Sequence, residues 1–252
     1  MTANPRGYCL LINNVDFEKD HHKQRLHSSD DANKLQETFQ WLGFIVKRED
    51  NLTAEQMVAF LRKYAKSKDE LKSHDAIVVI ILTHGYDSDH LFGVDGNMIK
   101  TPDILTFFNN KNCEPLRSKP KIFLIEGCRG VFYQKNQTDG RRSSIQIGDI
   151  RKLPQRVTGL RIPKEPTFQD MLISYSTAPE CDSNYEFDGA WYCTELCDRL
   201  KADASSKHIQ EILDDVYVSV YKKETPEGYH QYPCYENRGF VKKLYFNPEY
   251  YI

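Results

Sequence analysis

The sequence lacks any apolar run near the ~20 residues that a membrane-spanning helix needs. Residues 1–7 contain no hydrophobic signal core, so we do not expect secretion. Charge of one sign is not in excess either, because 34 Lys and Arg face 36 Asp and Glu, which gives a net charge of −2. This balance argues against a nucleic acid or an anionic membrane as the main partner. The composition predicts a globular protein of the cytoplasm.

Regularly spaced cysteines are also missing. The seven cysteines form an odd, irregular set, which predicts free thiols rather than a disulfide framework. Cys193 and Cys197 are four residues apart, but no second pair of Cys or His has matching spacing. We therefore expect buried structural thiols and no metal site. The basic run 140–152 lacks the interleaved aromatic residues of a nucleic-acid site, and we expect no cofactor.

Apolar runs and helical faces alternate along the chain. The apolar positions 32, 35, 39 and 42 share one helical face, and the spacing from Thr53 to Gln56 is typical of a capping box. We expect strands over 7–13, 44–48, 76–82, 122–125, 171–175 and 240–246, a hairpin over 91–99, and helices over 30–42, from 53, from 101, over 190–200 and over 207–222. This order indicates a parallel α/β fold, whose sites lie at the carboxyl ends of strands.

Two of the expected strands end next to residues suited to nucleophilic chemistry. One is followed by His84, and the other by Cys128. Adjacent parallel strands that end level would bring the two side chains together. A free thiol titrates near ~8.5, and a neighbouring histidine raises its thiolate fraction at neutral pH. The pattern predicts a cysteine nucleophile with a histidine partner. The alternative is a buried cysteine and a strand-end histidine with no joint role.

Eight short stretches, in the same order, resemble the catalytic domain of the caspase family over nearly the whole chain. They are residues 6–14, 31–39, 82–85, 92–96, 126–130, 176–179, 188–191 and 242–246. Residues 126–130 are similar to the family signature Q-A-C-[RQG]-G, which has a histidine upstream. The opening segment is especially similar to initiator caspases of the death-domain type. The resemblance implies a central, mostly parallel sheet flanked by helices on both faces.

The resemblance also implies how the chain is divided. It suggests a large subunit over 1–139, an intersubunit linker over 140–164 and a small subunit over 165–252, together one catalytic domain. The linker region is polar, basic and aperiodic, and a stretch of this length is usually functional or disordered. Asp139 and Asp149 are candidate cleavage sites in or beside it. Two such units would pair through the last strand near 240–246, as a homodimer or with another caspase.

The same resemblance assigns roles in a cysteine endopeptidase. Cys128 would be the nucleophile, and His84 would manage its proton and then protonate the leaving amine. The backbone N–H groups of Gly85 and Cys128 would form the oxyanion hole. The substrates would be proteins cut after aspartate, in apoptotic or inflammatory signalling. The enzyme would be made as a zymogen, with an adaptor or an activating protease as a further partner.

The substrate pocket departs from the family pattern. Caspases hold the aspartate with two arginines and the glutamine of the signature. Arg25 aligns with the first arginine, but Glu126 occupies the glutamine position. The second arginine would lie in a stretch that has no basic residue, and its equivalent position falls somewhere in 183–186. Ser183, Asn184 and Tyr185 are the candidate pocket residues there. If Arg25 and Glu126 pair, the pocket is close to neutral.

This divergence leaves three hypotheses open. The first is a caspase-type protease with a weakened preference for aspartate. The second is a catalytically weak pseudocaspase that dimerises with an active caspase and regulates it. The third is a protease of altered specificity, because an acid two residues before the cysteine is also found in metacaspases and paracaspases, which cut after basic residues. Arg25 would oppose a basic side chain.

Overall fold

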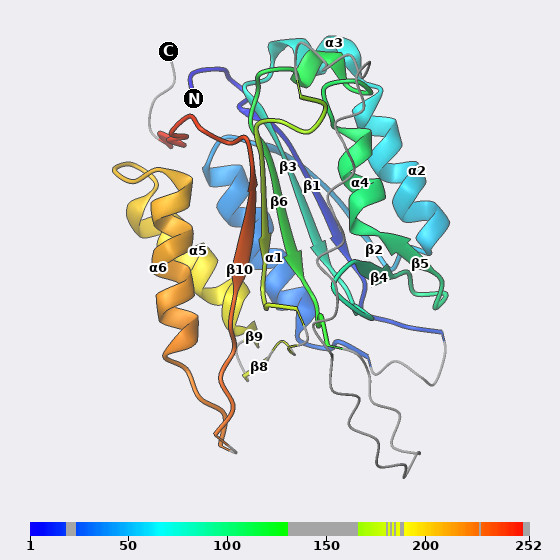
Figure 1. Ribbon diagram of the computed structural model, residues 1–252, viewed down its shortest axis with the longest axis vertical. Helices are drawn as coiled ribbons and strands as arrows, with labels where there is room; N and C mark the ends of the chain where they lie inside the picture. Colours follow the sequence, from blue (N-terminus) through cyan, green and yellow to red (C-terminus); the bar gives the residue numbers. More distant parts are fainter. Residues whose placement is uncertain are drawn as a thin grey trace, which may run out of the picture.

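The computed structural model describes residues 1–18, 24–130, 166–179, 181, 183, 185–186, 189–226 and 228–248. Its centre is a six-stranded sheet with the order β10-β7-β6-β3-β1-β2 (Figure 1). The strands are β1 (Gly7–Asn13), β2 (Ile45–Asp50), β3 (Ala76–Leu82), β6 (Lys121–Glu126), β7 (Met171–Tyr175) and β10 (Cys234–Arg238). All neighbours are parallel except β10, which is antiparallel to β7. The prediction of a mostly parallel central sheet is confirmed.

Helices cover both faces of the sheet, as predicted (Figure 1). One face carries α1 (Ser28–Trp41), α5 (Trp191–Asp203) and α6 (Ile209–Tyr221), and the other carries α2 (Ala54–Ala65), α3 (Lys68–Ser73) and α4 (Thr101–Phe107). Two short strand pairs lie outside the sheet, β4 (His90–Phe92) with β5 (Met98–Lys100) and β8 (Tyr185–Glu186) with β9 (Gly189–Ala190). A short 3-10 helix covers Glu114–Leu116. None of the helices in the described ranges is long and apolar enough to cross a membrane.

The alternation of side chains along each strand produces the two layers. Successive residues of a strand point to opposite faces. In β1, Cys9 and Leu11 join the core under α1, α5 and α6, whereas Leu10 and Ile12 join the core under α2 and α4. Every residue of β1 and β3 is buried. Parallel strands covered on both faces are apolar throughout for this reason.

The capping box predicted at Thr53 starts α2. The Thr53 hydroxyl accepts the N–H of Gln56 at 3.2 Å, and the Gln56 side-chain oxygen accepts the N–H of Thr53 at 2.9 Å. Both bonds satisfy donors that the first turn of a helix leaves open. The helix therefore begins at Ala54.

The predicted strand over 240–246 is wrong. The last strand in the described part of the chain is β10, and the apolar residues of 240–246 join the core of α1, α5 and α6 instead. The carbonyl of Leu244 accepts the N–H of Ile209 at 3.0 Å, and the Phe246 side chain is fully buried. Core packing, rather than a sheet ladder, accounts for the apolar character of this stretch. On this side the described sheet ends at β10, whose partly exposed polar residues are a weak strand signal.

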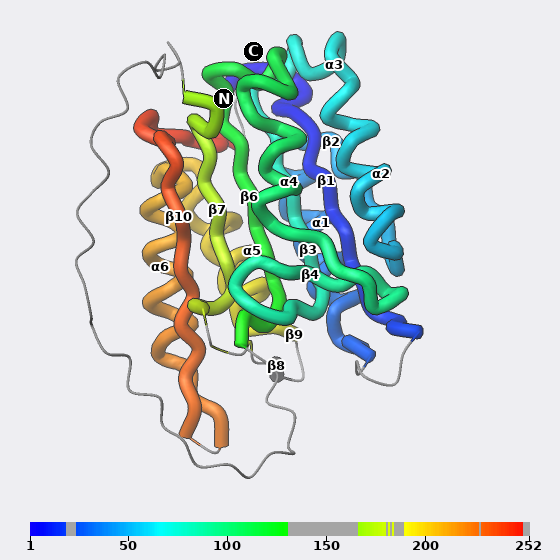
Figure 2. Tube along the Cα trace, turned by 45° about the vertical axis from the view of Figure 1, so that its right-hand side comes forward, coloured from blue at the N-terminus to red at the C-terminus, as the bar shows by residue number. Residues whose placement is uncertain are grey.

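Strands from before and after residues 131–165 lie in one sheet. β6 and β7 pair in parallel, from Lys121 opposite Met171 to Ile125 opposite Tyr175, and Figure 2 shows them side by side with β10. The two parts of the chain therefore share one hydrogen-bonded layer. The predicted division into two subunits and a linker stays a prediction.

Candidate active site

His84 and Cys128 follow neighbouring strand ends. β3 and β6 are parallel, and Leu82 lies opposite Glu126 at their last paired position. Each of the two residues comes two positions after its strand, and both are half-buried. The prediction that these strands are adjacent and end level is confirmed.

Two glycines bring the segments after the strands into contact. A Cβ atom on Gly85 would lie 2.0 Å from the carbonyl oxygen of Cys128, and one on Gly127 would lie 2.5 Å from the carbonyl oxygen of Thr83. Real Cβ atoms essentially never come within 3.0 Å of a heavy atom outside their own residue and its chain neighbours. The two backbones therefore touch where only glycine fits, and Gly85 lies directly against Cys128.

The segment of His84 is held from two sides. The Phe17 ring lies beside the imidazole, with ring centroids 4.7 Å apart and an angle of 48° between the planes. The N–H of Phe92 donates to the carbonyl of His84 at 2.9 Å, and Gly85 forms a bridge with Leu91. The β4–β5 hairpin thus fixes the backbone of His84 and Gly85, and the Phe17 ring limits the movement of the His84 side chain.

Arg129 anchors the segment of Cys128. Its guanidinium donates to the carbonyl of Ser88 through Nη2 at 2.9 Å and Nε at 3.2 Å. The same group lies 3.8 Å from the centroid of the Tyr175 ring, a cation–π contact. Sequence reasoning included Arg129 in the motif but gave it no role. Its place in the motif, directly after Cys128, is the signal that could have pointed to it.

Arg25 and Glu126 form a buried ion pair at the predicted pocket. Arg25 Nη2 donates to Glu126 Oε2, and the two side chains are 3% and 1% exposed. Arg25 Nη1 also donates to Ser28 Oγ at 2.9 Å and to the Asn14 carbonyl at 3.3 Å. One positive and one negative charge are therefore packed together. The pairing on which the near-neutral pocket depended is confirmed.

Ser183 and Gln231 extend this polar network. Ser183 Oγ donates to Glu126 Oε1 at 2.9 Å, so the predicted pocket residue Ser183 does contact Glu126. Gln231 Nε2 donates to Ser183 Oγ at 3.4 Å and to the Ser176 carbonyl at 2.6 Å. Gln231 is fully buried. Sequence reasoning missed it, because a single polar residue in a loop carries no periodic or motif signal.

Asp31 is a third charged group in this region. Both of its carboxylate oxygens accept the N–H of Ala190, at 3.0 and 3.2 Å, and the residue is 1% exposed. Gly189 packs against it so closely that a Cβ would lie 2.1 Å from Asp31 Oδ1. Burial raises the pKa of the Asp31 carboxyl to about 7, and the negative charge of Glu126 adds to the rise. The hydrogen bond from Ala190 and the charge of Arg25 lower this pKa and offset part of the rise.

The remaining predicted residues have different outcomes. Asn184, Asp139 and Asp149 lie outside the described residues. Tyr185 begins the short strand β8, and only its backbone is described. Both Cys193 and Cys197 are buried on α5, which confirms their predicted burial. Burial raises the pKa of each of these two thiols, most strongly at Cys193.

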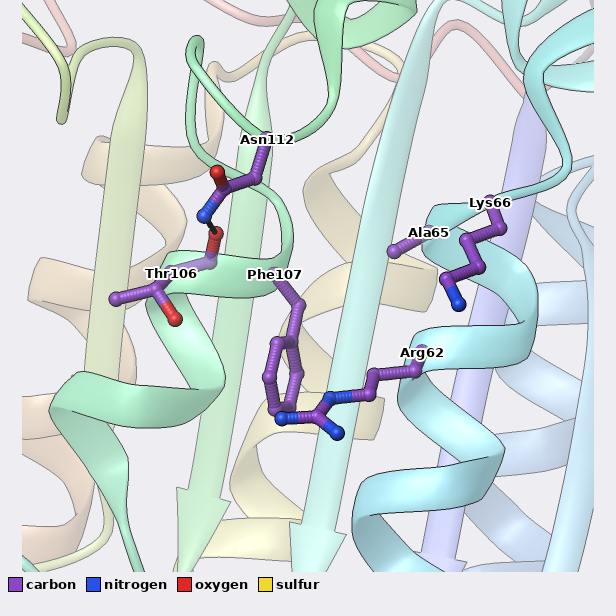
Figure 3. A pocket seen from close by; sticks show the side chains of 6 residues that line it. All are labelled: Arg62, Ala65, Lys66, Thr106, Phe107 and Asn112. Carbon is purple, nitrogen blue, oxygen red and sulfur yellow. Dashed lines mark hydrogen bonds between the residues drawn. The ribbon is translucent and has the colours of Figure 1, made fainter.

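A separate hollow of about 380 Å³ opens between α2 and α4 (Figure 3). Its lining residues are Arg62, Ala65, Lys66, Thr106, Phe107 and Asn112. Arg62 lies over the Phe107 ring, 5.0 Å from its centroid, and Asn112 Nδ2 donates to the Thr106 carbonyl at 2.7 Å. None of these lining residues was predicted to belong to a site, and the strand ends with His84 and Cys128 remain the candidate.

A mostly parallel sheet covered by helices, with a cysteine and a histidine after level, adjacent strand ends, is the arrangement that the resemblance to the caspase family implied. The family model of the caspase domain matches residues 6–245, and the chain belongs to this family. Members of the caspase family are cysteine endopeptidases.

Several curated relatives agree with this placement. Caspase-3 of Mesocricetus auratus is 32% identical, with 95% of this chain and 83% of the relative covered. Caspase-8 of Mus musculus is 31% identical, with 98% and 52% covered, and Caspase Dronc of Drosophila melanogaster is 28% identical, with 98% and 56% covered. The chain thus spans about half the length of the latter two relatives.

Proposed function

We propose that this chain is a caspase-type cysteine endopeptidase with Cys128 as nucleophile and His84 as its proton partner. The observation that carries the proposal is the backbone contact of Gly85 with Cys128 at the level ends of β3 and β6. This contact supports the proposal because the backbone of Gly85 lies against the carbonyl of the residue proposed as nucleophile, and its N–H group would be one donor to the oxyanion of acyl transfer. Family membership supports the same roles.

The chemistry follows from these positions. The Cys128 thiolate attacks the scissile carbonyl, and the N–H groups of Gly85 and Cys128 donate to the resulting oxyanion. Collapse of this intermediate expels the amine, which His84 protonates, and leaves a thioester on Cys128. Water activated by His84 then hydrolyses the thioester and regenerates the thiol. Loss of one oxyanion donor costs about 2.7–4 kcal/mol in such reactions.

The specificity proposed from the family is cleavage after aspartate, with a weakened preference. Arg25 supports recognition of a carboxylate, while the buried Glu126 carboxylate, paired with it, offsets that charge. Loss of one charge-assisted contact costs about 1.5–3 kcal/mol, which is roughly a tenfold to more than a hundredfold loss in binding.

The proposed setting follows from the relatives and the linker. We propose a role in apoptotic or inflammatory signalling, and Cell death protein 3 of Caenorhabditis remanei, 28% identical, supports the first of these two roles. We propose a cytoplasmic zymogen that is cut at Asp139 or Asp149 and works as a dimer with a second copy or another caspase. An adaptor or an activating protease would be the upstream partner.

A second candidate function is a pseudocaspase that regulates an active partner. The Arg25–Glu126 pair favours it, because the charge of each group already neutralises that of the other. Efficient cleavage of peptides by the purified chain alone would exclude this role.

The deciding experiment is cleavage of a peptide library randomised at the residue before the cut. Wild type, Cys128→Ala and Cys113→Ala are compared, each with a check of its folded state by circular dichroism. Cys113 is buried away from the strand ends and serves as the matched control. We expect turnover in wild type and in Cys113→Ala and none in Cys128→Ala. Equal turnover in all three would refute the proposal.

A further inference from the structure

A short loop, residues 86–89, connects the two segments of the candidate active site. It follows Gly85 directly in the chain. Its Ser88 carbonyl accepts two hydrogen bonds from Arg129, the residue after Cys128, at 2.9 and 3.2 Å. Because the loop is attached covalently to one segment and bonded to the other, its conformation affects both sides of the site.

A carboxylate inside the loop fixes this conformation. Asp87 Oδ1 accepts the N–H of Asp89 at 2.8 Å and the N–H of His90 at 2.9 Å. The two oxygens of the same carboxylate lie 2.8 and 2.9 Å from Nδ1 of the His90 ring. A hydrogen bond to an ionised acceptor is about twice as strong as one between neutral groups. One side chain therefore holds two successive backbone N–H groups and the ring of the residue that begins β4.

The peptide unit between Ser88 and Asp89 is held from both sides. In a planar trans peptide the N–H and the C=O point in opposite directions. Here the N–H donates to the Asp87 carboxylate, and the C=O accepts from the Arg129 guanidinium. Rotation of this unit away from the carboxylate would also turn the carbonyl away from the guanidinium. Asp87 therefore directs the Ser88 carbonyl toward Arg129.

The next peptide unit ties the loop to a helix. The N–H of His90 donates to Asp87, and the carbonyl of Asp89 accepts the N–H of Thr101 at 2.7 Å. Thr101 is the first residue of α4, whose apolar residues are packed into the core on that face of the sheet. The loop is thus fixed to a packed element, and Arg129 is bonded to a loop that has a defined place in the fold.

We propose that Asp87 is a positioning residue for the proposed peptidase reaction. It fixes the Ser88 carbonyl, which sets the place of Arg129. Arg129 in turn holds Cys128 beside the segment of His84. This inference rests on the proposed peptidase function and extends it to a residue outside the cysteine–histidine pair, one that acts through other groups and touches no substrate.

The first test compares peptide cleavage by wild type and three variants, with the library peptide that wild type cuts fastest. Asp87→Ala leaves two N–H groups without their acceptor, so kcat should fall at least tenfold while KM stays within about twofold. Asp87→Asn keeps an oxygen that accepts these N–H groups and should restore kcat to within about threefold of wild type. Asp89→Asn removes an exposed charge from the same loop and is the matched control, with unchanged kcat expected.

Folding is checked for each variant by circular dichroism and urea unfolding. The Asp87 side chain is 34% exposed, so its replacement leaves the apolar core intact. A double variant then tests the route through Arg129. If Asp87 acts through this residue, Asp87→Ala should lower kcat less than threefold in an Arg129→Lys background. A further tenfold loss in that background would mean that the two residues act independently, and it would overturn the proposed route.

Alkylation of Cys128 separates this inference from the proposed catalysis. Iodoacetamide reacts with the thiolate, which a neighbouring histidine favours, and mass spectrometry of the Cys128 peptide gives the rate without any substrate. At pH 7 we expect alkylation at least threefold slower in Asp87→Ala than in wild type and Asp89→Asn. If wild type cuts no peptide but this difference is found, the peptidase proposal fails and the positioning role stands. If Asp87→Ala matches wild type in both kcat and alkylation rate, the inference is overturned.

Discussion

Replacing Asp31 with asparagine should change the pH dependence of stability in a defined way. The buried carboxyl has a pKa of about 7 in the folded chain, against an ordinary value of 3.8. The folded state therefore binds the proton more tightly than the unfolded state, so the contribution of Asp31 to stability falls as the pH rises from 3.8 to about 7. Above that range both states are ionised, and the full cost of the buried charge is present.

The size of the effect follows from the two pKa values. Each tenfold change in proton affinity corresponds to about 1.4 kcal/mol, so the whole rise is worth about 4 kcal/mol. As the pH rises from about 5 to about 8, we expect the free energy of unfolding of wild type to lose roughly 2.5 kcal/mol of this amount. The amide of the Asp31→Asn variant can keep the contact with Ala190, because its oxygen accepts the same N–H. The free energy of unfolding of this variant should thus rise by about 2.5 kcal/mol relative to that of wild type between pH 5 and pH 8.

Urea unfolding at several pH values measures this difference. The other carboxyls are common to both proteins, so their contributions to the pH dependence cancel in the comparison. Asp30→Asn is the matched control, since Asp30 is exposed on the same first turn of α1 and its replacement should not reproduce the pH-dependent gain. If the free energies of unfolding of wild type and Asp31→Asn change in parallel with pH, the reasoning is refuted.

Three further predictions concern other contacts. Gly85→Ala should lower kcat/KM about a hundredfold with the fold retained. The new Cβ would force the backbone at residue 85 and the Cys128 carbonyl about 1 Å apart. Unchanged turnover would contradict this contact. Arg129→Lys should lower the free energy of unfolding by about 1.5–3 kcal/mol, since lysine cannot reproduce the two bonds to the Ser88 carbonyl or the stacking on Tyr175. Chemical denaturation measures this change, and an unchanged free energy would argue against Arg129 as an anchor. Thr53→Ala should cost about 1 kcal/mol by loss of the capping box, while Thr53→Ser should restore most of it in the same assay.

Local patterns predicted most of the fold. The strands 76–82 and 171–175 were predicted with their observed bounds, because buried parallel strands are apolar throughout and end at clear breaks. The prediction failed at 240–246, where the apolar residues are buried in the core shared with α1, α5 and α6 and not in a strand. The observed edge strand β10 carries few apolar residues on which a pattern could form.

At the candidate site, too, local sequence patterns predicted only part of the arrangement. Sequence reasoning placed Cys128 and His84 correctly after the ends of adjacent strands, because each follows its own strand directly. It did not reveal Asp31 or Gln231 as neighbours of the pocket, since their contacts join positions far apart in the chain. Such tertiary hydrogen bonds depend on the finished fold and leave no local signature.

The pairing of β6 with β7 has a consequence for the order of the refolding reaction. The register from Lys121 opposite Met171 to Ile125 opposite Tyr175 joins chain segments that a cut within 131–165 would separate covalently. Before the cut, unfolding is unimolecular and its midpoint is independent of concentration. After the cut, complete unfolding releases two fragments, so the midpoint should rise with protein concentration and refolding should become second order. A nick there would leave the native sheet joined while making its recovery after unfolding depend on the meeting of two molecules.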